Sequence, residues 1–205
     1  MLYEVRTYTL IPNAIPEYEK RFAQGLAHRE KFSKLAAFWH TDIGPLNQVI
    51  HVWPYNDLEE RRKVRAAAVK EGVWPPKASE LYVDTRSEVF TPAPFMRPLN
   101  TQKVGPIFEM RTYTYKVGAM SQVLKLWEER IAWREKLSPM VACWYSEFGE
   151  LNRFVHIWAY KSLDERARIR VESFKDRSKW PAPTQEWLLA QENKIMLPAS
   201  FSPVQ

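Results

Sequence analysis

Apolar and polar positions follow two periods along the chain, and one succession of these periods occurs twice. Strands bring every second side chain to one face, whereas helices bring every third or fourth. Residues 3–9 alternate and are rich in Tyr and Thr, while apolar side chains recur at helical steps from Ile15 to about Leu35. The pattern predicts a first unit of strand, helix, strand, strand, helix and strand at residues 3–9, 15–35, 36–41, 48–54, 57–71 and 81–90.

Local signals mark the ends of the predicted helices. Asn13 can cap the first helix, because its side chain can accept a hydrogen bond from a free backbone N–H group. Asp57 with Glu60 forms a capping box at the start of the second helix, and Gly72 ends it. The order β-α-β-β-α-β is the ferredoxin-like arrangement.

The second half of the chain repeats the first. Segment 39–55 returns as 144–160 at a constant offset of 105 residues, and FEMRTYT at 108–114 repeats YEVRTYT at 3–9. Identical in both copies of the longer segment are Trp39/Trp144, Gly44/Gly149, Leu46/Leu151, Asn47/Asn152, His51/His156, Trp53/Trp158 and Tyr55/Tyr160. The sequence therefore predicts an α+β protein of two tandem ferredoxin-like domains. We expect the following boundaries: domains at 1–98 and 107–205, and a Pro-rich linker at 91–106 that overlaps the end of the first domain.

Composition narrows the class of protein. Of the 205 residues, 45% are hydrophobic and 14% aromatic, which is enough for a substantial core. No apolar run approaches the roughly 18 residues that a membrane span needs. The first ten residues read as a strand, so we expect no signal peptide. The single cysteine, Cys143, excludes an internal disulfide and favours a cytoplasmic protein.

The net charge of +6 could indicate an anionic partner, but the basic residues have a simpler explanation. Many of them, such as Arg61, Arg65, Arg166 and Arg170, fall on predicted helices between apolar positions. A solvated helix face explains them better than a nucleic-acid surface, which would show a denser stripe or a known motif. We therefore expect no nucleic acid and no membrane among the partners, and we expect a homo-oligomer.

The two faces of each predicted sheet differ in chemistry. On the third strand Ile50 and Val52 share one face, and His51, Trp53 and Tyr55 share the other. Thr7 and Thr9 are identical in both copies although they fall on the expected helix side. The face that carries His51 has aromatic and charged side chains, so it is too apolar for water and too charged for an ordinary core. We expect the halves to bury these faces against each other and close a barrel around a polar cavity. In the first half the face carries Glu4, Arg6, Tyr8, Trp39, His51, Trp53 and Tyr55.

The strand motif YEVRTYT/FEMRTYT, the helix motif HREK/WREK and the hairpin G-x-L-N…H-x-W-x-Y resemble the NIPSNAP family over nearly the whole chain. The resemblance implies ferredoxin-like units of the dimeric α/β-barrel type, here in tandem, so that one chain could supply both halves of a barrel. Animal members are associated with mitochondria, vesicle traffic and mitophagy signalling. We expect no mitochondrial presequence here and do not transfer those roles. The wider barrel superfamily includes small monooxygenases, isomerases and haem enzymes, and fold alone does not choose among them.

The face whose residues recur in both copies also supplies the candidate chemistry. His51 and His156 are the catalytic candidates, because imidazole exchanges protons near neutral pH and could polarise a carbonyl or ligate haem iron. Their alternative role is structural, fixing the barrel interface through hydrogen bonds. Arg6 and Arg111 could bind a carboxylate or simply neutralise the glutamate two residues before them. The expected ligand-binding residues are Arg6, Tyr8, Trp39, Trp53, Arg111, Tyr113, Trp144 and Trp158, although Trp side chains are more often part of a core or interface than of a ligand cage.

Two functions of different classes remain open from the residues. The first is a barrel that binds a small, partly aromatic, acidic ligand, either as a binding protein or as a cofactor-independent enzyme. The second is a protein-interaction or scaffold module whose barrel is filled by side chains. No zinc spacing, GxGxxG, Walker loop or nucleophile elbow occurs, so we expect no metal and no cofactor, with haem as the one remaining option.

Overall fold

The computed structural model describes residues 1–205 as two α+β units of the same construction. The first unit contains β1 (Leu2–Leu10), α1 (Ile15–Arg29), β2 (Ala37–Ile43), β3 (Gln48–Tyr55), α2 (Leu58–Val69) and β4 (Tyr82–Pro92). The second contains β5 (Ile107–Tyr115), α3 (Met120–Arg134), β6 (Met140–Ser146), β7 (Arg153–Tyr160), α4 (Leu163–Ser173) and β8 (Leu188–Pro198). The predicted order of elements is confirmed in both halves.

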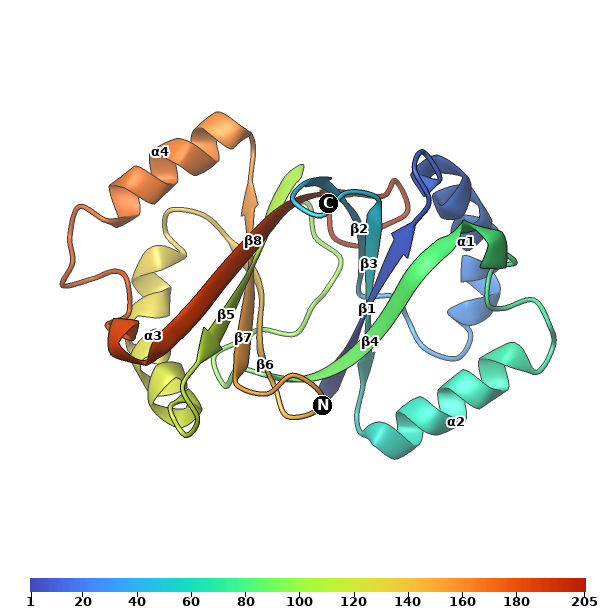
Figure 1. The fold of residues 1–205 in the computed structure, drawn as a ribbon, viewed down its shortest axis with the longest axis horizontal. Helices are drawn as coiled ribbons and strands as arrows, with labels where there is room; N and C mark the ends of the chain where they lie inside the picture. Colours follow the sequence, from blue (N-terminus) through green and yellow to red (C-terminus); the bar gives the residue numbers. More distant parts are fainter.

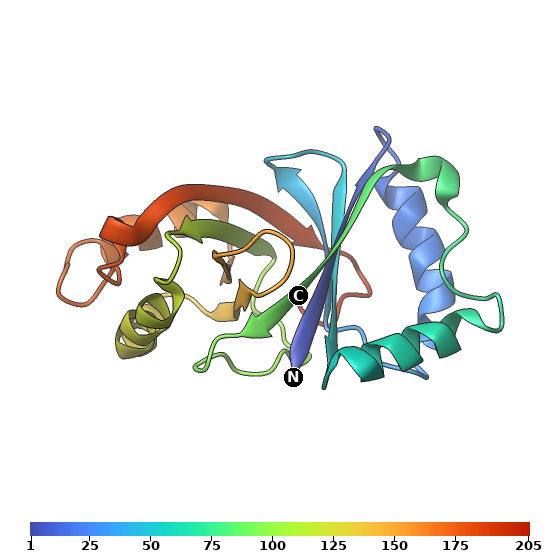
Figure 2. The ribbon, with the colours of Figure 1, turned by 60° about the horizontal axis from the view of Figure 1, so that its bottom comes forward.

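All eight strands close into one barrel in the order β1-β3-β2-β8-β5-β7-β6-β4. Strands that correspond between the halves lie four places apart in this ring, so the barrel axis is also an approximate twofold axis. The halves meet along two antiparallel seams, β2 with β8 and β4 with β6. The helices lie on the outside, α1 and α2 over one half and α3 and α4 over the other (Figures 1 and 2). The predicted barrel of two tandem ferredoxin-like units is confirmed.

The helix ends agree with the sequence signals at the second helix of each unit and differ at the first. The Asp57 carboxylate accepts from the Glu60 backbone N–H at 2.7 Å, and Ser162 caps α4 in the same way. The prediction for Asn13 is wrong, because Ala14 is the N-cap residue and Asn13 adopts a left-handed φ of 66°. Helix α1 ends at Arg29 rather than near Leu35.

The prediction of which sheet face the helices cover is wrong. One core cluster, which includes Val5, Ile50 and Val52 with their counterparts from the second half, lies inside the barrel. Trp53 and Tyr55 pack instead with Tyr18 and other side chains of the helical layer. Alternation along a strand separates the two faces but does not say which one the helices cover. The charged and aromatic face is the outer one, and α1 and α2 cover it.

Each half also reaches into the core of the other half beyond its last strand. After β8, Phe201 packs in the core under α1, where its ring lies 5.6 Å from that of Phe22. After β4, Phe95 packs in the equivalent core of the second half. The expected linker begins inside β4, since Thr91 and Pro92 pair with β6. None of the helices is long and apolar enough to cross a membrane.

Candidate functional site

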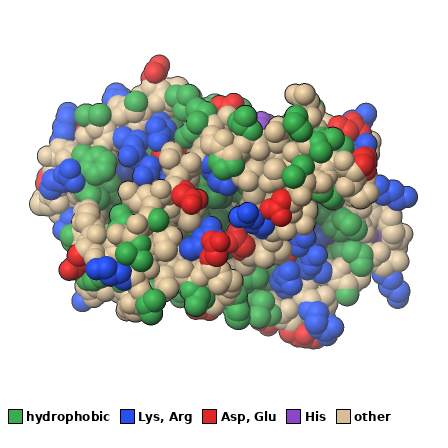
Figure 3. Space-filling view, in the orientation of Figure 1, with side chains coloured by type: hydrophobic (Ala, Val, Ile, Leu, Met, Phe, Trp, Pro, Cys, Tyr) green, Lys and Arg blue, Asp and Glu red, His purple; other side chains and the backbone are tan.

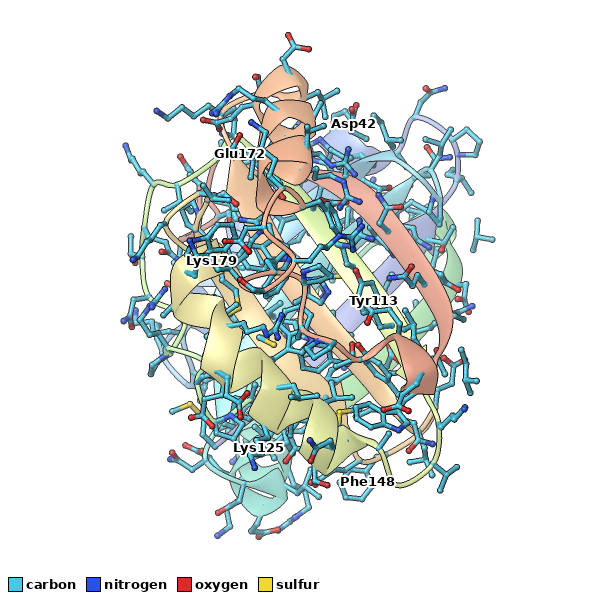
Figure 4. The ribbon with its side chains drawn as sticks, turned by 90° about the vertical axis from the view of Figure 1, so that its left-hand side faces the viewer. Asp42, Tyr113, Lys125, Phe148, Glu172 and Lys179 are labelled. Atoms are coloured by element: carbon cyan, nitrogen blue, oxygen red, sulfur yellow. The ribbon has the colours of Figure 1, made fainter.

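A pocket lies between the sheet and the two helices of each half. The pocket of the first half has a volume of about 300 Å³ and that of the second half about 230 Å³. In the first half the side chains that matter for its chemistry are Arg6, Tyr8, Arg29, His51, Trp53 and Arg65. In the second half the corresponding side chains are Arg111, Tyr113, Arg134, His156, Trp158 and Arg170. In Figure 4 Tyr113 lies in the space bordered by α3, α4 and β8.

A tryptophan fixes the protonation state of the histidine in each pocket. His51 and Trp53 are two residues apart on β3, so both side chains point toward the helices. The indole Nε1–H of Trp53 donates to Nδ1 of His51 at 2.7 Å, and Trp158 donates to His156 over the same distance. An indole N–H can only donate, so Nδ1 must be the acceptor. A neutral imidazole in this arrangement carries its proton on Nε2.

That Nε2–H group has no hydrogen-bond partner within the protein in either half. His51 and His156 are each only 2% exposed. Burial lowers the pKa of both imidazoles well below the usual value, and the positive charge of Arg6 or Arg111 lowers it further. Each pocket is therefore lined by a neutral imidazole with one unused donor.

A buried glutamate holds the arginine of β1 in place. Glu4 is 0% exposed and accepts hydrogen bonds from Arg6 at 2.7 Å, Arg61 at 2.7 Å and Ser87 at 2.6 Å. Burial alone would raise the pKa of Glu4, but these donors and the charge of Arg65 outweigh it and lower the pKa to about 2. The carboxylate is therefore ionised and committed to its arginines.

The second half repeats this cluster. Glu109 accepts from Arg111 at 2.7 Å, from Arg166 at 2.6 Å and from Asn193 at 3.2 Å. Burial opposes ionisation, but the hydrogen bond from Arg166 and the charge of Arg111 lower the pKa of Glu109 below its usual value. An equivalent set of interactions thus recurs at corresponding places in the two units.

In each half the same strand arginine also donates to a tyrosine hydroxyl and leaves the hydroxyl proton free. Nε of Arg6 donates to the hydroxyl oxygen of Tyr8 at 2.5 Å, and Arg111 donates to Tyr113 at 2.9 Å. Because this oxygen already accepts from a guanidinium, the hydroxyl proton is free to donate elsewhere.

Helix α1 contributes a second arginine to the pocket wall. The guanidinium of Arg29 lies 4.1 Å from the centre of the Trp53 ring and donates to the hydroxyl of Tyr55 at 2.9 Å. Arg134 lies at the same distance from Trp158. These planar groups form a rigid, cationic wall beside the histidine.

The two pockets differ at one helix position and one strand position. Phe22 of α1 corresponds to Trp127 of α3, and the larger indole accompanies the smaller of the two volumes. Tyr82 of the first pocket corresponds to Leu188 of the second. The arginines and the histidine of the pocket are thus shared by both halves, and the apolar and aromatic lining differs at these two positions.

The structure brings most of the predicted site residues together and separates one pair. Arg6, Tyr8, His51 and Trp53 line one pocket, and their four counterparts line the other. Trp39 and Trp144 do not belong to these pockets. Trp39 pairs with Ile50 across β2 and β3, so it shares the face that points into the barrel. The histidines therefore do not face the barrel cavity that the sequence predicted. They face pockets outside the barrel wall, under the helices.

Sequence reasoning missed the helix residues of the site. The solvated-face interpretation is wrong for Arg61 and Arg166, which bind the buried glutamates, and Arg65 and Arg170 line the pockets. It holds for residues such as Arg62, which is 69% exposed. The available signal was the identity of Arg29/Arg134, Arg61/Arg166 and Arg65/Arg170 in both copies of the repeat.

The histidines do not fit the role of iron ligands. A ligating imidazole needs a nitrogen without a proton, and its other nitrogen usually donates to a fixed acceptor. Here the indole forces the reverse, with Nδ1 accepting and the proton on Nε2. No group of three or more His, Cys, Asp or Glu side chains is arranged to hold a metal ion.

Comparison with known proteins finds the same family in both halves. The family model described as NIPSNAP matches residues 3–97 and 108–203. Protein NipSnap homolog of Dictyostelium discoideum is 32% identical over 207 residues, which cover 98% of this chain and 88% of that protein. Human protein NipSnap homolog 3A is 27% identical over 214 residues, covering 100% and 86%. A solved anthrone oxidase-like protein has the same fold, with a TM-score of 0.62, 10% identity and coverage of 98% and 93%.

Proposed function

The chain belongs to the NIPSNAP family, and we propose that it binds a small acidic molecule with a flat, partly aromatic body in the pocket of each half. The observation that carries this proposal is the buried Nε2–H donor of His51 and of His156, which has no acceptor in the protein. An unmet buried donor costs about 1–3 kcal/mol, so a ligand that supplies an oxygen acceptor recovers that free energy.

The other polar groups of the pocket favour the same ligand. The first pocket is lined by Arg6, Arg29 and Arg65 and by no carboxylate. The second contains four arginines and one carboxylate, Glu109, which its arginines already hold. Donors and positive charge together select a carboxylate over a neutral group, since a guanidinium matches its two oxygens.

The walls account for the flat body of the ligand. Trp53 and Trp74 lie with ring centres 6.1 Å apart, and Phe22 lies 4.9 Å from Trp74. Rigid aromatic walls of this kind prefer planar guests, which stack or meet them edge to face. The volumes are at or just below the lower end of the range for small-molecule sites.

If the protein is an enzyme, the arrangement suits cofactor-independent chemistry on a carbonyl compound. The Nε2–H of His51 would donate to the carbonyl oxygen and stabilise negative charge that develops there. A guanidinium would hold the carboxylate, and the Tyr8 hydroxyl would supply a proton. His51 would not be the base, because its Nδ1 is engaged and its Nε2 is already protonated.

The test is isothermal titration calorimetry with benzoate, with benzamide as the matched neutral probe. We expect two benzoate sites per chain and at least tenfold weaker binding of benzamide. His51→Phe should reduce the stoichiometry to one site, and His51→Phe with His156→Phe should abolish both. His51→Gln retains an N–H donor and should retain the first site. His40→Gln changes a histidine outside both pockets, bonded to Glu19 at 2.7 Å, and should bind as wild type.

The scaffold function is the second candidate, because part of the barrel interior is filled by packed side chains. In that case His51 would be held by the surrounding aromatic rings alone. Benzoate and benzamide binding equally, or benzoate affinity unchanged in the double His→Phe variant, would contradict the acid-binding proposal. Binding of neither probe would contradict it and support the scaffold.

A further inference from the structure

The barrel interior is closed at one end and hollow toward the other. At the closed end the linker residues Met96, Leu99 and Val104 pack against the interior core, which also includes Val204 of the C-terminal tail. Gln102 pairs with Val204 and ties the linker to the tail. At the other end a cavity of about 540 Å³ lies between the halves. Figure 3 shows acidic and basic side chains gathered around a hollow in the middle of this face.

The walls of this cavity come from both halves and are apolar at depth. Val5, Phe90, Met110, Trp144 and Val155 form the apolar part of the lining and belong to the interior core. This cavity contains none of the residues of the two helix-side pockets, which lie on the opposite face of the strands. It is therefore a separate space with its own chemistry.

One side chain of the apolar part has a buried hydrogen-bond donor that no protein group accepts, as its counterpart Trp39 also has. Trp144 is 0% exposed, lines the cavity, and its indole Nε1–H has no partner in the protein. An indole nitrogen can only donate, so a bound molecule must bring an acceptor to satisfy it.

The rim of the cavity contains a cation that forms no ion pair, although the charges of Glu192 and Glu88 act on it. Nζ of Lys194 donates to the side-chain oxygen of Gln48 at 2.9 Å and forms no ion pair within 4.0 Å. The other cations of the rim are occupied, since Arg153 binds Glu88 and Arg86 binds Asp84. Lys194 is the cation left for a ligand.

The rim is also asymmetric about the barrel axis. Glu88 pairs with Val5 across β4 and β1, and Lys194 pairs with Met110 across β8 and β5, so the two occupy equivalent places. Arg86 and Glu192 are related in the same way. At both positions the charge is reversed between the halves.

We propose that this cavity is a third binding site, for a small aliphatic carboxylic acid that carries a second oxygen on its chain. The carboxylate binds the Lys194 ammonium at the rim, the hydrocarbon lies on Val5, Met110 and Phe90, and the second oxygen accepts from Trp144. The site is independent of the two helix-side pockets, which take a flat acid.

The experiment uses octanoate and 8-hydroxyoctanoate as probes in isothermal titration calorimetry. We expect one site per chain and tighter binding of the hydroxy acid. Lys194→Met keeps the length of the side chain without its charge and should weaken both probes at least tenfold. Lys194→Arg should bind nearly as wild type. In Trp144→Phe the advantage of 8-hydroxyoctanoate over octanoate should disappear, and a melting curve confirms that this variant is folded.

Two outcomes would overturn the proposal. The first is octanoate binding that does not change in Lys194→Met. The second is octanoate binding at two sites that are lost in the double variant His51→Phe with His156→Phe, which would place the acid in the helix-side pockets. Failure of benzoate to bind those pockets leaves the octanoate result unaffected, so the two proposals can fail separately.

Discussion

At the scale of single residues, the tryptophan two positions after each histidine determines what that histidine can do. A free imidazole near neutral pH is an acid, a base or a metal ligand. The indole of Trp53 or Trp158 removes two of these roles, because it occupies Nδ1 and fixes the proton on Nε2. What remains is a neutral donor that does not titrate in the ordinary range.

We predict that His51 and His156 stay neutral, with the proton on Nε2, from pH 8 to pH 5. Burial first and the nearby arginines second lower the pKa of both. Nitrogen-15 correlation spectra of histidine-labelled protein report the tautomer directly. A spectrum in which either imidazole gains a second proton near pH 6.5 would be the contrary result.

The same lowered pKa values carry a consequence for stability. The unfolded histidines take up protons below about pH 6.5 and the folded ones do not. The stabilisation from burying neutral imidazole is therefore complete above that pH and is lost as pH falls toward the folded pKa. In that window each histidine lowers the free energy of unfolding by up to about 1.4 kcal/mol per pH unit. Urea unfolding at pH 7 and pH 5 measures the loss, which should shrink in His51→Gln with His156→Gln.

At the scale of elements, the strands show what the sequence could and could not predict. The alternation correctly grouped Arg6 with Tyr8, and His51 with Trp53. The pattern and its repeat predicted the β-strands and α-helices, but not the two short 3-10 helices. The alternation did not reveal which face carries the helices. Identical Thr7 and Thr112 were a contrary signal, since both line the barrel cavity. Trp39 was assigned to the wrong face because a tryptophan suits a core as well as a pocket.

The solvated-face interpretation of the helix arginines failed because their acidic partner is far away in the sequence. Arg61 and Arg65 are four residues apart and so lie on one face of α2, which points at Glu4. Their partner Glu4 is 57 residues from Arg61 in the sequence, and no local pattern reveals a contact of that separation. A basic helix face looks solvated until the buried carboxylate beneath it is placed.

Replacing the buried carboxylate tests this coupling between strand and helix. We predict that Glu4→Gln lowers the free energy of unfolding by about 3 kcal/mol, because Arg6 and Arg61 lose their counter-charge. The contribution of Glu4 is present above about pH 4.5 and is lost as pH falls toward its folded pKa of about 2. Denaturant unfolding from pH 7 to pH 2 should therefore show a flatter profile in the variant. Glu17→Gln removes an exposed ion pair with Arg21 and should change little.

At the scale of the whole molecule, each half is completed by residues of the other. Phe201 comes from the end of the second repeat and packs 5.0 Å from Phe38 of the first. Phe95 makes the reciprocal contribution to the core of the second repeat. The two units are therefore interlocked rather than merely adjacent, and we expect them to unfold together.

We predict that Phe201→Ala lowers the free energy of unfolding by about 2 kcal/mol, the cost of truncating a partly buried ring. Hydrogen exchange followed by mass spectrometry should show faster exchange in β3 and also in β7, although the substitution touches only the first core. Faster exchange confined to the first half would mean that the units unfold separately.

The reversed charges at the barrel mouth have one more consequence, which concerns the orientation of a guest. A rim built from two identical subunits repeats every group, so an asymmetric molecule has two equivalent poses on the axis. Here Lys194 stands opposite Glu88, and Glu192 opposite Arg86, so the two poses differ in energy. A tandem chain can thus hold its guest in a single direction, a choice that no symmetric homodimer of the same fold can make.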